Sequence, residues 1–139
     1  MTTRIMAAVE HFTGDGEQLQ AFEAEFGVSD KNGRPRKIYD HTTGKVDASV
    51  VKSWESYDLG KFVQRNASKL LHQLNDKVHV YVGAVDNFLL NEAVTAFAQK
   101  AATAKVPVIT ELIPGADHWS IWSEAFTKRV VAEIDAKVK

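Results

Sequence analysis

The sequence of 139 residues predicts an α/β fold with three layers, in which helices cover both faces of a parallel sheet. Two short runs rich in β-branched residues, 77–82 and about 108–113, have the length and composition of buried strands. An Ala-rich stretch with helical periodicity, from Asn87 or Leu89 to Lys105, lies between them. Two strands joined by one helix form a right-handed unit with parallel strands, so these three segments predict the fold class.

The first predicted strand and the helix after it have clear local signals. In 77–82, valines alternate with His79 and Tyr81, which gives the strand two faces that must both be covered. The strand ends at Gly83, and the helix ends before Pro107 because proline cannot continue a helix. The sequence therefore predicts a buried strand followed by a helix that packs on the sheet.

The segments on either side of this unit are predicted to be helices. Residues 114–118 form a turn after the second strand, and apolar residues at helical spacing then mark a final helix. Upstream, Asp47 is the predicted N-cap of a helix over 48–54, and Asp58 caps a helix that runs to about Leu74. The later elements are therefore expected in the order helix, strand, helix, strand, helix.

The first part of the chain follows a less regular pattern. Short helices are expected over 4–12 and 17–26, but Gly, Asp, Asn and Lys interrupt every periodic pattern within this part of the sequence. We therefore expect two domains. Residues 1–47 form an irregular, lid-like or insert segment, and residues 48–139 form the α/β portion.

The composition restricts the classes of partner. With 45% hydrophobic and 25% charged residues, the chain has the composition of a globular protein. No apolar run reaches the roughly 18 residues needed to cross a bilayer, and a net charge of −1 argues against a nucleic-acid partner. The chain has no cysteine, which excludes disulfides, thiolate catalysis and Cys-based metal sites. We expect a cytoplasmic chain whose partner is a small molecule or another protein.

Asp86 and His118 each come directly after a predicted strand. Because the C-terminal ends of parallel strands lie at one edge of a sheet, we expect the two side chains to meet within reach of a hydrogen bond or one water. A carboxylate beside an imidazole fixes the tautomer of a general base and stabilises its protonated form, as hydrolases require. The spacing is also compatible with Asp86 capping the next helix and His118 serving as a turn residue.

Other polar and aromatic residues are weaker candidates. Trp119 follows His118 directly and is expected to border a substrate pocket, while His41 lies in a turn and is expected to line the mouth of that pocket. His79 is interpreted as a core histidine of the first strand. Asp117, His118 and a second histidine have no spacing that supports a metal site.

Two stretches of the sequence resemble a known family. The run 77–90, in which a strand ends in Gly and is followed by Asp, an aromatic residue and Leu, and the segment 115–119 are similar to the C-terminal part of bacterial serine esterases of the enterochelin-esterase-like group. The segments 30–35, 39–47 and 54–59 look like the region between the sixth and seventh strands of that family. The resemblance therefore covers the chain from about Glu25 onward.

This resemblance implies the last parallel strands of an α/β-hydrolase sheet with flanking helices. It implies that Asp86 is the acid of a catalytic triad, that His118 is its base, and that no cofactor or metal is needed. Such enzymes carry the nucleophilic serine on a Gly-x-Ser-x-Gly elbow, which is absent from this chain. The nearest imitation surrounds Ser29 and lacks the second glycine, while Ser120 and Ser123 are expected to be caps or surface residues.

We therefore expect the C-terminal part of a serine carboxylic-ester hydrolase that carries the triad acid and histidine, lacks the nucleophile and is inactive alone. The alternative is a free-standing, non-catalytic α/β module for binding or assembly. In the complete enzyme the partner would be a small-molecule ester. A hydrolase sheet cut before strand 77–82 leaves an unpaired edge, so we also expect self-association through that edge.

Overall fold

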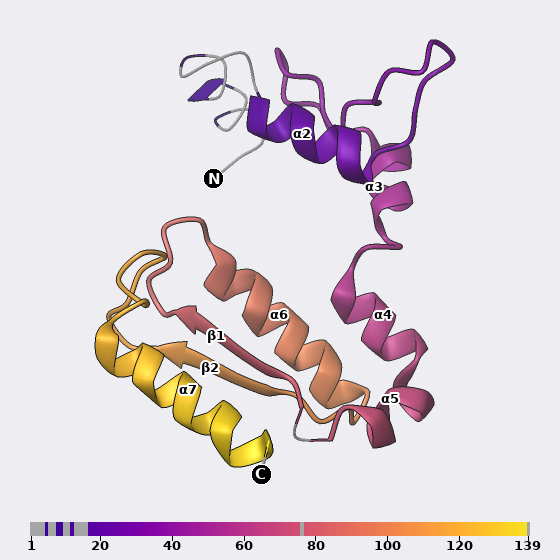
Figure 1. Cartoon of the computed structure of the whole chain (residues 1–139). Coiled ribbons are helices and arrows are strands. Elements are labelled where there is room, and N and C mark those ends of the chain that lie inside the picture. Colours follow the sequence, from indigo (N-terminus) through magenta and orange to yellow (C-terminus); the bar gives the residue numbers. More distant parts are fainter. Residues whose placement is uncertain (1–4, 6–7, 10–11, 13–16, 76, 139) are drawn as a thin grey trace. The chain divides into compact units, whose positions relative to one another are not determined.

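The computed structural model describes residues 5, 8–9, 12, 17–75 and 77–138. Contacts divide the chain into two compact units, Met1–Asp58 and Leu59–Lys139 (Figure 1). The helix expected over 4–12 lies largely outside the described residues. Both predicted strands lie in the second unit.

The first unit contains α2 (Glu17–Phe26) and α3 (Ala48–Trp54), which confirms the two helices predicted for those segments. Two isolated antiparallel bridges lie between them in sequence. The small core of this unit is formed by Leu19 and Tyr39, against which Ile38 packs. This part of the chain is therefore more ordered than its turn-rich sequence suggests.

The start of α3 shows why the helix begins at Ala48. The Asp47 carboxylate accepts hydrogen bonds from the backbone amides of Ser49 and Val50, as predicted for an N-cap. It also accepts a hydrogen bond from Arg36 Nη2 at 2.8 Å. The cap therefore ties the helix to a residue eleven positions earlier in the chain.

Aromatic contacts join α3 to the rest of the first unit. The ring of Phe26 lies 5.9 Å from that of Trp54 and 5.1 Å from that of Tyr57, in edge-to-face arrangements. The sequence placed the domain boundary after residue 47, whereas the contacts divide the chain after Asp58. Phe26, the last residue of α2, contacts Trp54, the last residue of α3, which groups α3 with the first unit. The lid-like role expected of residues 1–47 stays a prediction.

The second unit contains β1 (His79–Gly83) and β2 (Ile109–Ile113), which pair in parallel. In the register of the pair, His79 lies opposite Ile109 and Gly83 opposite Ile113. The helices of this unit are α4 (Leu59–Arg65), α5 (Ala67–Gln73), α6 (Leu90–Thr103) and α7 (Glu124–Val138). The predicted order of elements is confirmed, apart from the division of the first helix into two.

Helices α6 and α7 cover opposite faces of the two strands (Figure 1). On the α6 side, α4 also packs against α6, and the buried side chains are those of Val63, Leu70, Ala101 and Val106. On the α7 side, the Tyr81 ring packs edge-on against Phe126 at 5.4 Å. The chain therefore has a mixed α/β fold in which a parallel pair of strands lies between helices.

Two helix boundaries differ from the sequence prediction. The single helix expected from Asp58 to about Leu74 is interrupted at Asn66, whose side-chain amide donates to the Phe62 carbonyl at 2.8 Å. Such local bonds from Asn compete with the helical backbone pattern. The last helix begins at Glu124 rather than near Trp119. In the turn before it, the Asp117 carboxylate accepts hydrogen bonds from the amides of Trp119 and Ser120.

The end of α6 is set by backbone bonds rather than by Pro107. The Lys105 amide donates to the Ala102 carbonyl and the Val106 amide to the Ala101 carbonyl, both at 3.0 Å. With Lys105 at a φ of 57°, these bonds form the Schellman arrangement that commonly ends helices. Val106 and Ala101 are buried together at this end.

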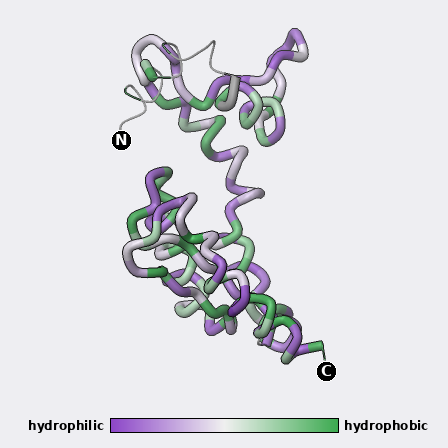
Figure 2. Tube along the Cα trace, turned by 60° about the vertical axis from the view of Figure 1, so that its left-hand side comes forward, coloured by the Kyte–Doolittle hydropathy of each residue, from purple (hydrophilic) through white to green (hydrophobic). Residues whose placement is uncertain are grey.

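Hydrophobic and hydrophilic stretches alternate along the Cα trace, including the helix that ends at the C-terminus (Figure 2). None of the helices in the described part of the chain is long and apolar enough to cross a membrane. The alternation is typical of helices that bury one side against a core.

Candidate active site

Asp86 and His118 meet at the C-terminal edge of the two strands. His118 Nδ1 lies 3.0 Å from Asp86 Oδ2, which confirms the predicted contact. The Asp86 side chain is 2% exposed and the His118 side chain is 35% exposed. A buried carboxylate therefore holds an imidazole that remains accessible to a small molecule.

The second oxygen of Asp86 organises the turn that follows β1. Asp86 Oδ1 accepts hydrogen bonds from the amides of Phe88 at 2.8 Å and Leu90 at 3.3 Å. The sequence is compatible with Asp86 either capping the next helix or pairing with His118. In the structure Asp86 Oδ2 pairs with His118, and Asp86 Oδ1 accepts from the first amide of α6, whose N-cap residue is Leu89.

The surroundings of Asp86 keep it ionised. Burial acts to raise the pKa of Asp86, but hydrogen bonds from the Phe88 amide, the His118 ring and the Leu90 amide outweigh burial and hold the pKa below its usual value. An ionised carboxylate only accepts hydrogen bonds, so Nδ1 of His118 carries the proton. In a neutral ring, Nε2 is then the nitrogen that can accept a hydrogen bond or a proton.

A glycine at the end of β1 allows the two side chains to meet. A Cβ on Gly83 would lie 2.3 Å from the Ala116 carbonyl oxygen and 2.7 Å from that of Asp117. The turn before His118 therefore passes directly over the Gly83 Cα. Gly115, at a φ of 71°, follows Pro114 in this turn, which matches the residue preferences of a type II turn.

Two residues that the sequence did not single out also contact His118. The Asn87 side-chain oxygen accepts a hydrogen bond from the His118 amide at 3.3 Å, and the Phe88 ring packs edge-on at 4.7 Å from the imidazole. Asn87 and Phe88 follow Asp86 by one and two positions in the sequence. Their position after a predicted acid, and for Phe88 its place as the aromatic residue in the run 77–90, are the signals that point to them.

Trp119 lies beside the imidazole, as its place in the sequence requires. Its ring centroid is 5.0 Å from that of His118, and the residue is 69% exposed. A groove of about 380 Å³ that includes Asp86 and His118 is lined instead by Trp122 and Phe126. A role for Trp119 in substrate binding remains a prediction.

His41 belongs to the first unit. Its Nε2 lies 3.5 Å from Glu23 Oε1, and its ring lies 5.2 Å from that of Tyr39. Glu23 is buried and also accepts a hydrogen bond from the Ile38 amide at 2.8 Å. The structure brings His41 together with these residues, and its expected position at a pocket mouth stays a prediction.

The serines after His118 stabilise turns. Ser120 Oγ donates to Asp117 Oδ1 at 2.8 Å, and Ser123 Oγ accepts from the Phe126 amide at 3.2 Å. Ser29 lies in the first unit, in an antiparallel bridge with Pro35. None of these hydroxyl groups forms a hydrogen bond with His118 among the interactions of the described residues.

No protein-family model matches this chain, and neither a curated protein nor a solved structure shows significant similarity to it. In the part of the chain that the structure describes, no group of three or more His, Cys, Asp or Glu side chains is arranged to hold a metal ion. The chemistry of the site therefore rests on the geometry of Asp86 and His118.

Proposed function

We propose that this chain is the C-terminal part of a serine carboxylic-ester hydrolase. In this proposal Asp86 is the triad acid and His118 the general base, while the serine and the oxyanion hole belong to a part of the enzyme outside this sequence. The serine would attack the ester carbonyl, His118 Nε2 would take and return its proton, and Asp86 would hold the imidazole.

The observation that carries the proposal is the 3.0 Å contact between Asp86 Oδ2 and His118 Nδ1 at the ends of two parallel strands. Acid and base follow each other along the chain in the order that α/β-hydrolases use. The groove next to the pair is lined mainly by apolar side chains, including Trp122 and Phe126, which suits the carbon chain of an ester.

The alternative is a non-catalytic α/β module for binding or assembly. It is favoured by the hydrogen bonds of Ser120 and Ser123, which serve turns and leave the imidazole without a serine partner among the described residues. In this alternative the buried bonds of Asp86 serve to fix the turn after β1.

Ester hydrolysis by the isolated chain provides the first test. Without an activated serine and an oxyanion hole, turnover should be close to background, since each loss costs several kcal/mol of transition-state stabilisation, on the order of 3 kcal/mol for one oxyanion donor. The chain should hydrolyse p-nitrophenyl acetate no faster than its His118→Ala variant. A fluorophosphonate probe should label no serine, and stoichiometric labelling of Ser29 or Ser120 would mean that this chain contains a complete active site.

The native gene product separates the two functions. An antibody raised against α7 would isolate the polypeptide from its source cell for measurement of its mass and of its reaction with a fluorophosphonate. The hydrolase proposal expects a substantially longer product that reacts with the probe and loses its esterase activity on His118→Ala substitution. A product of the present length that does not react would support the non-catalytic module.

A further inference from the structure

The segments 84–90 and 114–123, which follow β1 and β2, expose six large apolar side chains among the residues that the structure describes. We call this set the apolar rim: Val85, Phe88, Leu89, Leu90, Trp119 and Trp122. The most exposed of them are Trp122 at 71% and Val85 at 61%. A concentration of exposed apolar side chains in one place indicates an interaction site.

The apolar rim surrounds the accessible side of His118. The Phe88 ring lies 4.7 Å from the imidazole and 6.4 Å from the ring of Trp119. The Trp119 ring itself lies 5.0 Å from the imidazole. Leu90 and Trp122 line the groove of about 380 Å³ that also includes His118. The rim and the candidate active site are therefore parts of one surface.

The sequence around the rim contains no lysine or arginine. The stretches 83–90 and 113–123 have three titratable residues, namely Asp86, Asp117 and His118. The Asp86 carboxylate is buried against His118, and that of Asp117 accepts hydrogen bonds from the amides of the next residues in its own turn. An anionic lipid or a nucleic acid would be held by cationic side chains. The rim therefore suits an uncharged surface.

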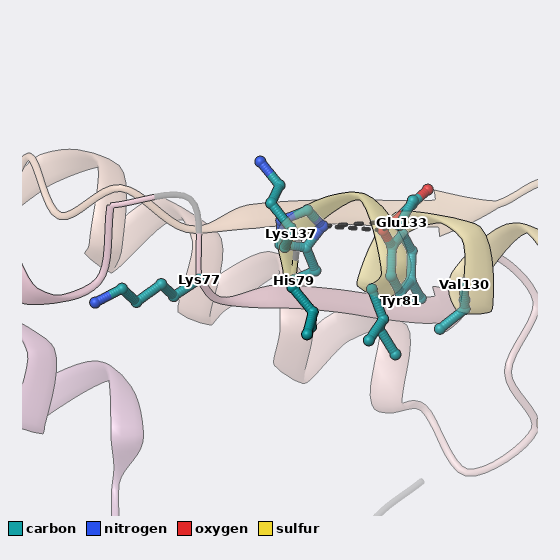
Figure 3. Close-up of a pocket in the computed structure, with 8 residues that line it drawn as sticks. Lys77, His79, Tyr81, Val130, Glu133 and Lys137 are labelled. Carbon is teal, nitrogen blue, oxygen red and sulfur yellow. Dashed lines mark hydrogen bonds and ion pairs between the residues drawn. The ribbon is translucent and has the colours of Figure 1, made fainter.

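Charged side chains gather toward the other end of the strands. Figure 3 shows a hollow of about 440 Å³ beside β1, lined by Lys77, Glu133 and Lys137 among other residues. Glu133 accepts hydrogen bonds there from the Tyr81 hydroxyl and from Arg129 Nε. Lys77 precedes β1 and Lys137 lies in the last turn of α7, whereas the apolar rim follows the ends of both strands. The strands thus have a charged end and an apolar end.

We propose that the apolar rim docks on a neutral lipid surface, from which a water-insoluble ester enters the groove beside His118. This inference rests on the proposed function and names its substrate class. The two tryptophans suit the boundary between lipid and water, because the indole ring is largely apolar while its N–H can bond to water or headgroups. Such docking lies on the surface and needs no helix that crosses a membrane.

A lipid surface fits the rim better than a folded protein partner does. Phe88 and Trp119 flank the imidazole of His118, and a general base must stay within reach of the substrate. A folded protein seated on both rings would close this access. Lipid molecules instead exchange places with one another, so the ester itself can move from the surface into the mainly apolar groove.

Flotation of the full chain with phosphatidylcholine vesicles tests the proposal. We expect the chain to float with the vesicles and its tryptophan emission to shift to shorter wavelength, since two of its three tryptophans belong to the rim. Replacing part of the lipid by phosphatidylserine, or raising the salt concentration, should leave binding unchanged because the rim carries no cationic side chain. His118→Ala should also bind, since docking does not use the reaction.

Substitutions in the rim show whether it is the surface that binds. Val85→Asp and Trp122→Asp place a charge at exposed positions and should each lower the lipid partition coefficient by at least about tenfold. The matched control is Val131→Asp, because Val131 is 51% exposed on α7 and lies outside the rim. It should leave the coefficient unchanged. Circular dichroism of each variant will show that the fold is kept.

Absence of binding to phosphatidylcholine would overturn the proposal. So would binding that requires phosphatidylserine, or binding that survives Val85→Asp and Trp122→Asp together. Sedimentation equilibrium without lipid measures the self-association expected from the sequence, and a dimer that Val85→Asp dissociates would assign the rim to a second copy instead. A native gene product that does not react with fluorophosphonate would contradict the proposed function, whereas vesicle binding by this chain would still establish the docking surface.

Discussion

Asp86 uses its two carboxylate oxygens for different partners, and this division can be tested by a single substitution. In Asp86→Asn, the retained oxygen can still accept from the Phe88 and Leu90 amides, while the new NH₂ group faces His118 Nδ1. An amide donates a hydrogen bond, so we expect His118 to change to the tautomer protonated on Nε2. Nitrogen-15 NMR of the His118 ring measures this directly.

The control for this substitution is Asp117→Asn. Asp117 is the neighbouring acid, and its Oδ1 accepts from the amides of Trp119 and Ser120 rather than from the imidazole. It should leave the His118 tautomer unchanged. An Nδ1 proton that persists in Asp86→Asn would contradict the assignment of Asp86 as the residue that orients the ring.

Gly83 is the residue on which the geometry of the pair depends most directly. A methyl group there would meet two backbone carbonyl oxygens at 2.3 and 2.7 Å, so the turn before His118 must move. We expect Gly83→Ala to lower the free energy of unfolding by about 1–3 kcal/mol, as overpacking does, and to break the bond between Asp86 and His118. Denaturant unfolding and the Nδ1 proton signal of His118 measure the two effects.

Gly115→Ala provides the comparison for Gly83→Ala. A Cβ at Gly115 meets no heavy atom within 4 Å, so only its φ of 71° opposes the change. The expected cost is about 1 kcal/mol, with the bond between Asp86 and His118 retained. Equal losses of stability for the two variants would mean that the close approach over Gly83 is unimportant.

At the scale of single elements, the end of α6 contains a residue that is poorly suited to its backbone. Lys105 occupies the left-handed position of the Schellman arrangement, at a φ of 57°, where glycine has no steric penalty. We expect Lys105→Gly to raise the free energy of unfolding by up to about 1 kcal/mol, whereas Lys105→Ala should not. Thermal and urea unfolding of the natural chain and of the two variants measure these differences in stability. A Lys105→Gly variant that is less stable than the natural chain would contradict the prediction.

The N-cap of α3 should make the first unit sensitive to acid. A hydrogen bond from the Ser49 side chain, opposed by burial and assisted by Arg36, lowers the pKa of Asp47 to about 2 from 3.8. Because the folded pKa lies below the unfolded one, ionised Asp47 stabilises the fold above about pH 4, and this contribution is lost as the pH falls toward 2. NMR titration of the Asp47 carboxyl group measures its pKa, and unfolding experiments at each pH measure the loss of stability.

The matched variant for the acid experiment is Asp47→Asn. Asparagine is still an N-cap but does not titrate, so the fall in stability between about pH 4 and pH 2 should be smaller than in the natural chain. An identical fall in both proteins would show that other carboxyl groups account for the acid sensitivity.

The elements were largely predictable from local patterns, whereas their ends were not. Strand 77–82 and the helix after it were visible because apolar residues recur at the periods of strands and helices. The break at Asn66 and the left-handed Lys105 were not visible, since each depends on which backbone groups happen to be free nearby. The expected ending of α6 at Pro107 had the correct position to within a few residues but the wrong physical cause.

At the scale of the whole molecule, the second unit contains everything that the pair of Asp86 and His118 needs. Its two buried clusters, centred on Ala101 and on Phe126, consist only of residues after Asp58. We expect a segment of residues 59–139 to fold alone, with the circular dichroism and His118 ring signals of the full chain. A segment without helical signal, or with a different His118 tautomer, would contradict this prediction.

The candidate site was predictable to the extent that it follows from topology. Asp86 and His118 were expected to meet because parallel strands bring their C-terminal ends to one edge, and that rule needs no side-chain detail. The contacts of Asn87 and the close approach at Gly83 depend on how a distant turn lies over the strand, which no local pattern reports. The assignment to a serine esterase stays a prediction from the resemblance of short segments.

The passage of the turn over Gly83 also determines where the chain tolerates changes of length. The backbone from Pro114 to Asp117 spans the gap between the end of β2 and His118 with its carbonyl groups against the Gly83 Cα, so one inserted residue there would carry the imidazole past the carboxylate. Among the described residues, the connection between α6 and β2, near Lys105 and Pro107, makes no comparable contact with the pair. During divergence of such chains, insertions should therefore accumulate in that connection and remain rare in the turn before the histidine.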